Sequence, residues 1–179
     1  MGVAIIRELI LTELERGLPG VTPEVGAACS QAAAVCLEDR KHVVGVEMAL
    51  TGDKRETFKV EWKRPDARAI RAWSDLAEAV ECGACAVAFL VILAVTDFAV
   101  IGRSVKGTGI DYWLGKKSGV LFEQAARLEV SGILRGDAAA IERRVETKKR
   151  QRRRSEATMI PGYVVVVEFS MPTTKMVKT

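Results

Sequence analysis

The order of secondary-structure patterns between residues 65 and 170 constrains the fold of this chain more than any other feature. Pro65 and Asp66 suit the first turn of a helix, because proline has no N–H to leave unpaired and a carboxylate stabilises the positive end of the helix dipole. We predict that this helix continues to about Ala94. Its expected buried stripe, at spacings of three and four, is Ile70, Trp73, Leu76, Ala77 and Val80.

Strand-like segments follow this helix. Residues 97–104 and 109–115 are apolar, and the glycine-containing sequence VKGT between them predicts a hairpin. A third strand is expected within residues 122–133. Gly136 and Asp137 then provide a turn and an N-cap for a second long helix, and the valine-rich residues 162–170 predict a last strand. The order helix, three strands, helix, strand indicates an α+β fold.

The first 64 residues extend this core within what we expect to be a single domain, 1–179. Residues 1–17 have apolar side chains at helical spacing and predict a helix. A second helix is predicted from Thr22, with proline at its first position, to about Leu37. Residues 42–50 and 56–63 flank the sequence TGDKR, which predicts another hairpin. We expect residues 171–179 to form a frayed tail.

Composition excludes some classes of protein. With 179 residues, 49% of them hydrophobic, the chain can bury one ordinary core. Its most apolar run, residues 84–96, is 13 residues long and ends at Asp97, whereas a membrane-spanning helix needs about 20. The run therefore predicts a buried helix and no membrane. The four cysteines follow no secretory signal, so we expect reduced thiols in a cytoplasmic protein.

Positive charge is concentrated in one segment. The formal net charge is only +4 and the isoelectric point about 9.0, but residues 143–154 read RRVETKKRQRRR. Such density suits a polyanionic partner. A solvated helix face is the alternative, and it carries about equal weight.

Two acids occupy strand positions that leave their roles open. Asp111 begins a strand directly after the turn KGTG, where it either caps the turn or points at something outside the protein. In the next strand, period-two alternation places Glu129 on the same face as Arg127 and Ser131. Strand position favours a surface acid paired with Arg127, and the alternative is membership of a polar site.

The element order together with the segments GIDYWL and LEVS resembles the core of the PD-(D/E)XK nuclease superfamily. The resemblance covers residues 65–170 and implies a restriction-endonuclease-like αβββαβ core, with the preceding residues as an addition. It further implies that Asp111 and Glu129 hold Mg²⁺ or Mn²⁺, with Glu78 or Glu81 of the first helix as a third acid. Two carboxylates on adjacent strands suit Mg²⁺, which prefers oxygen ligands and keeps several of its waters.

The sequence departs from the superfamily pattern at Ser131, where a catalytic lysine is usual. Ala138, Ile141 and Val145 predict the buried stripe of the last helix, and its continuation passes through Lys148. Lys148 is therefore our candidate for a relocated catalytic lysine, with a cation that snorkels to solvent as the alternative. The expected nucleic-acid-binding cations are Lys106, Arg144, Lys149 and Arg152.

Three functional readings follow. The first is a metal-dependent nuclease that hydrolyses phosphodiester bonds in nucleic acid, with DNA the expected form, as a homo-oligomer or within a larger complex such as a bacterial defence or repair system. The second is a non-catalytic nucleic-acid-binding or assembly subunit that retains the nuclease-like fold. The third is a purely structural protein whose basic helix is a solvated face.

Overall fold

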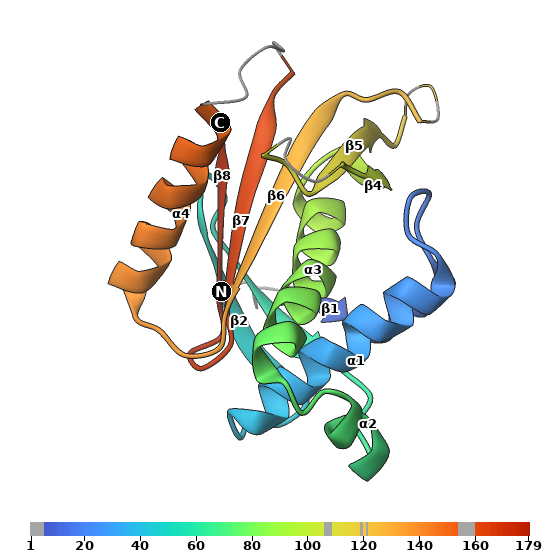
Figure 1. Cartoon of the computed structure of the whole chain (residues 1–179), viewed down its shortest axis with the longest axis vertical. Helices are drawn as coiled ribbons and strands as arrows, with labels where there is room; N and C mark the ends of the chain where they lie inside the picture. Colours follow the sequence, from blue (N-terminus) through green and yellow to red (C-terminus); the bar gives the residue numbers. More distant parts are fainter. Residues whose placement is uncertain (1–5, 106–108, 119, 121, 154–159) are drawn as a thin grey trace, which may run out of the picture.

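A computed structural model describes residues 6–105, 109–118, 120, 122–153 and 160–179, with the backbone alone for 151–153 (Figure 1). Eight strands form one mixed sheet in the order β1-β3-β2-β8-β7-β6-β5-β4. The strands are β1 (Arg7–Ile10), β2 (Val46–Gly52), β3 (Glu56–Glu61), β4 (Phe98–Arg103), β5 (Tyr112–Lys116), β6 (Ala126–Ile133), β7 (Gly162–Glu168) and β8 (Thr173–Lys178). The helices are α1 (Pro23–Asp39), α2 (Ala67–Ala72), α3 (Leu76–Val95) and α4 (Ala138–Arg153), with a 3₁₀ helix at Leu11–Arg16.

The α+β class and most of the expected element order are confirmed. Strands β4, β5 and β6 form an antiparallel meander, and β7 joins β6 in parallel after α4. The single helix expected from Pro65 is wrong, because the chain breaks into α2 and α3 at Trp73–Asp75. Asp75 caps α3 by accepting a hydrogen bond from the Ala77 N–H at 2.9 Å. Ile70 consequently lies on a short separate helix and is exposed, and Ala77 of α3 is exposed too, so neither belongs to a buried stripe as expected.

The structure corrects both predictions for the ends of the chain. Within residues 1–17, of which 1–5 lie outside the described part, the structure has β1 and the 3₁₀ helix in place of a long helix. Strand β1 pairs in parallel with β3, a partner distant in sequence. The expected tail at 171–179 contains β8, which lies between β2 and β7 and pairs with both. The hairpin of β2 and β3 and the helix α1 are confirmed.

The sheet has a different cover on each face (Figure 1). Helices α1 and α3 bury one face, where Leu128 of β6 and Val165 of β7 belong to the main core. Helix α4 lies on the opposite face, and its Ile141 and Val145 pack on Val164 and Val166 of β7. Because strand side chains alternate between faces, Glu129 of β6 belongs to the α4 side.

Helix α3 is the central helix of the main core. By length and composition it could cross a membrane, with a mean hydropathy of 2.1 over its most apolar window. It is nevertheless mostly buried inside the protein, against the sheet and α1. The prediction that the apolar run at 84–96 is a buried helix is therefore confirmed.

Helices α1 and α3 approach each other so closely that only glycine fits at one contact. A Cβ atom on Gly83 of α3 would lie 2.8 Å from the Ala33 Cα and 2.8 Å from its backbone nitrogen. The neighbouring buried positions are also small, including Ala32 of α1 and Ala86 of α3. Small residues thus set the spacing of the helix pair that covers this face of the sheet.

Candidate functional site

Asp111 directly precedes β5, and Glu129 lies on the neighbouring antiparallel strand β6. Tyr112 pairs with Leu128, so the register continued by one residue places Asp111 opposite Glu129. The Asp111 N–H donates to the Leu128 carbonyl at 3.0 Å, which extends the ladder to this position. The Asp111 Oδ2 accepts a hydrogen bond from the Val130 N–H at 2.8 Å. Asp111 therefore has a structural contact with β6, and it remains half-buried.

Glu129 forms a largely buried ion pair with Lys148. The Lys148 Nζ lies 2.9 Å from the Glu129 Oε1, and the two side chains are 21% and 5% exposed. The expectation that Glu129 is a surface acid is wrong, because its side chain is buried and pairs with Lys148 of α4. The Arg127 guanidinium donates to the Ile160 carbonyl at 2.8 Å. Lys148 thus points inward at a carboxylate instead of extending into solvent.

The other side chains of this face complete a polar strip on the sheet. Trp113 pairs with Arg127 across β5 and β6 and is half-buried, whereas Tyr112 points into the main core against Phe89, with ring centroids 4.8 Å apart. Ser131, at the position of the usual lysine, is buried. We call Asp111, Glu129 and Lys148 the acid–lysine site.

The structure does not bring the expected third acid to this site. Glu78 and Glu81 are exposed on the first turns of α3, on the opposite side of the sheet from α4. In the part of the chain that the structure describes, no group of three or more His, Cys, Asp or Glu side chains could hold a metal ion. A cation at the acid–lysine site would therefore have at most two carboxylates from the site, and Mg²⁺ tolerates so few because it usually retains several waters.

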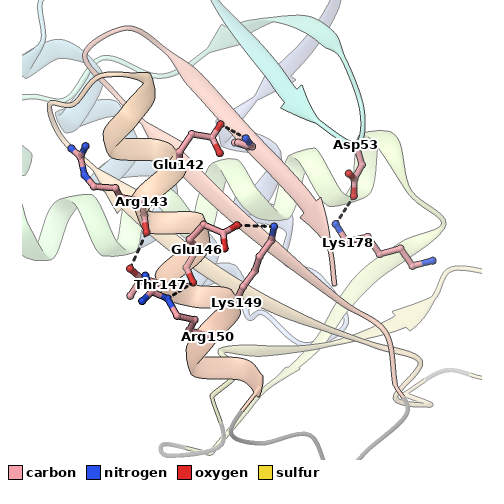
Figure 2. Close-up of polar contacts among 9 residues, drawn as sticks. Asp53, Glu142, Arg143, Glu146, Thr147, Lys149, Arg150 and Lys178 are labelled. Atoms are coloured by element: carbon pink, nitrogen blue, oxygen red, sulfur yellow. Dashed lines mark hydrogen bonds and ion pairs between the residues drawn. The ribbon is translucent and has the colours of Figure 1, made fainter.

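The expected nucleic-acid-binding cations lie along α4 or outside the described residues. Lys106 lies outside the described residues, as does the side chain of Arg152. Arg144 is exposed. Lys149 turns to the other flank of α4, where its Nζ lies 3.0 Å from the Glu146 Oε1 (Figure 2). The adjacent residues Lys148 and Lys149 thus lie on different flanks of α4 and pair with different acids, Glu129 and Glu146.

A groove of about 570 Å³ runs along that other flank, between α4 and strands β2 and β8. Lys175 of β8 and Glu142 of α4 form an ion pair here, and Asp53 accepts a hydrogen bond from the Lys178 N–H at 2.5 Å (Figure 2). Sequence reasoning missed this groove because it depends on β8, which was expected to be frayed. Its walls carry both signs of charge, from residues such as Arg55, Lys149, Asp53 and Glu142.

No protein-family model matches the chain, and comparisons with curated proteins and with solved structures also return no match. The candidate site therefore depends on its own geometry, which is the ion pair of Glu129 with Lys148 of the covering helix and the hydrogen bond of Asp111 to the neighbouring Val130 N–H.

Proposed function

We propose that this protein is a metal-dependent nuclease that hydrolyses phosphodiester bonds in nucleic acid, with DNA as the expected substrate. The observation that carries the proposal is the ion pair of Glu129 and Lys148 under the basic helix α4, with Asp111 hydrogen-bonded to the backbone of the β6 residue next to Glu129. Helix α4 supplies cations beside the site, as binding to a phosphate backbone requires. The resemblance of this core to the PD-(D/E)XK superfamily supports the same reading.

Each residue of the acid–lysine site has a distinct task in this proposal. Asp111 and Glu129 supply the carboxylate oxygens that Mg²⁺ or Mn²⁺ prefers. When bound, such an ion polarises the phosphate and lowers the pKa of a bound water. Lys148, whose Nζ lies 2.9 Å from the Glu129 Oε1, would supply positive charge beside that carboxylate and beside a bound phosphate. The relocation of this lysine to α4 accounts for Ser131 at the usual position.

The alternative is a non-catalytic binding or assembly subunit. This alternative is favoured because both acids already have structural contacts. Asp111 accepts a hydrogen bond from the Val130 N–H, and Glu129 forms an ion pair with Lys148. In that case α4 binds nucleic acid or a partner and the acids maintain the sheet. Under either reading we place the protein in the cytoplasm, as a homo-oligomer or in a larger complex.

The discriminating experiment incubates the purified protein with plasmid DNA, single-stranded DNA and RNA, with Mg²⁺, Mn²⁺ or a chelator. The variants are Asp111→Asn, Glu129→Gln and Lys148→Gln. The first two keep an oxygen that can accept the hydrogen bonds seen from the Val130 N–H and from Lys148, so the fold should survive. Glu142→Gln and Lys175→Gln, in the groove on the other flank of α4, are the matched controls.

The nuclease proposal expects cutting that requires the metal, is lost in the three site variants, and persists in the two controls. Since an acid that binds metal contributes to the transition state, the expected loss is at least about 100-fold. Salt-sensitive binding of nucleic acid without cutting, equal in parent and site variants, would overturn the nuclease proposal in favour of the binding subunit.

A further inference from the structure

Two cysteines from different helices lie side by side in the interface of α1 and α3. The Sγ atoms of Cys29 and Cys82 are 3.2 Å apart, and both residues are free thiols. The neighbouring contact of Gly83 with Ala33 holds the helices at close range, since Ala33 lies one turn after Cys29 and Gly83 directly follows Cys82. The close packing of α1 on α3 therefore places the two thiols, one from each helix, in contact.

The two thiols differ in access. Cys82 is partly exposed, whereas Cys29 is buried. The hydrogen bond with Cys29 lowers the pKa of the Cys82 thiol, against the opposite effect of burial. Burial raises the pKa of Cys36 and of Cys85 to about 12. Within the pair, Cys82 is thus the more accessible thiol and the one with the greater thiolate character, and the buried Cys29 is in position to react second.

We propose that Cys29 and Cys82 form a reversible disulfide on reaction with a hydroperoxide, so that the chain carries an oxidant-sensitive clamp between α1 and α3. The Cys82 thiolate attacks a peroxide oxygen, the O–O bond breaks, and the alkoxide or hydroxide leaves and takes up a proton. Cys29 sulfur then attacks the resulting Cys82 sulfenic acid, and the S–S bond forms as the S–O bond breaks. The leaving hydroxide takes the Cys29 proton and departs as water.

The electrons balance, because the two thiols together lose two electrons and the hydroperoxide gains them. The movement needed is small, since sulfurs 3.2 Å apart must approach by roughly 1 Å to reach the distance of a covalent bond. A reducing cytoplasm would keep the pair as thiols at rest, and transient oxidation is the form that intracellular disulfides usually take. This clamp is independent of the acid–lysine site, on the other face of the sheet.

The test treats the reduced full-length chain with hydrogen peroxide and measures intact mass, free thiols and cross-linked peptides. Trypsin leaves Cys29 with Cys36 in one peptide and Cys82 with Cys85 in another, so serine variants of each cysteine must assign the bond. We expect the mass to fall by two hydrogens and two of the four thiols to disappear, both reversed by dithiothreitol. The cross-link should form in Cys36→Ser and Cys85→Ser and be absent in Cys29→Ser and Cys82→Ser.

In Cys29→Ser, the Cys82 sulfenic acid should persist and react with dimedone, because its resolving thiol is gone. Should a serine variant fail to fold, fragmentation of the cross-linked wild-type peptide assigns the same bond. A cross-link between Cys82 and Cys85, a bond between two chains, or four thiols that remain after peroxide treatment would each overturn the proposal.

Discussion

Replacement of Lys148 by methionine removes the ammonium group that neutralises Glu129 and leaves a carboxylate in a largely buried position. The Glu129 side chain is 5% exposed, so water replaces the lost contact poorly. Removal of one partner of a buried ion pair costs about 3–5 kcal/mol. Because Lys148 itself is 21% exposed, we expect the lower end of that range, about 3 kcal/mol.

For a chain of this size each kcal/mol lowers the melting temperature by about 2–4 °C, so Lys148→Met should lower it by about 6–12 °C. The assay is chemical denaturation with thermal unfolding as a second measure. Lys149→Met is the matched control, since Lys149 and Glu146 form a surface pair with side chains 30% and 57% exposed. We expect this control to change stability by less than about 1 kcal/mol.

A double variant, Glu129→Met with Lys148→Met, removes both charges and should recover to within about 1 kcal/mol of the parent, since an apolar pair of similar volume replaces a buried ion pair well. The reasoning that Lys148 stabilises a charged Glu129 is refuted by either of two results. In one, Lys148→Met lowers the free energy of unfolding no more than Lys149→Met does. In the other, the double variant is the least stable of the three.

Three further outcomes are expected. Gly83→Val should destabilise the protein by about 3 kcal/mol, because the added side chain overpacks against the Ala33 backbone. Gly102→Ala, with no atom within 4 Å of its added Cβ, should change stability by less than about 0.5 kcal/mol. Equal denaturation midpoints for the two variants would contradict this. A chain that ends at Met171 loses β8 and should lose its cooperative thermal transition in circular dichroism, and a retained transition would show that β8 is dispensable. Iodoacetamide at pH 8 should label Cys82 before Cys36 and Cys85, because thiols with a pKa of about 12 hold little thiolate there; faster labelling of Cys36 by mass spectrometry would contradict the assigned burial.

Local signals predicted the elements of the core well. The turn residues between 103 and 111 and the Asp137 cap gave the hairpin of β4 and β5 and the start of α4, because turn and cap chemistry acts within a few residues. The signal for the break between α2 and α3 was also local, since Ser74 and Asp75 are good capping residues, but the continuous apolar spacing concealed it.

Pairings between distant segments were beyond the reach of sequence patterns. Arg7–Ile10 has apolar spacing compatible with a helix and becomes a strand because β3 offers it an edge. Thr173–Lys178 alternates as a strand does, but its terminal position hid the fact that two strands flank it. For the candidate site, the alternation of strand side chains placed Glu129 on the correct face of β6. Its burial could not be predicted in this way, because it depends on α4, which begins nine residues later and folds back over the sheet.

The position of β8 has a consequence for how the protein is made. This strand follows the other seven in chain order, yet it lies in the middle of the sheet and joins β2 to β7, with Ala49 paired to Thr173. During synthesis, the hairpin of β2 and β3 therefore emerges long before the strand that links it to the rest of the sheet. The edge of β2 that pairs with β8 stays unpaired until β8 has been synthesised. Nascent chains are therefore most prone to aggregation or chaperone binding in that interval.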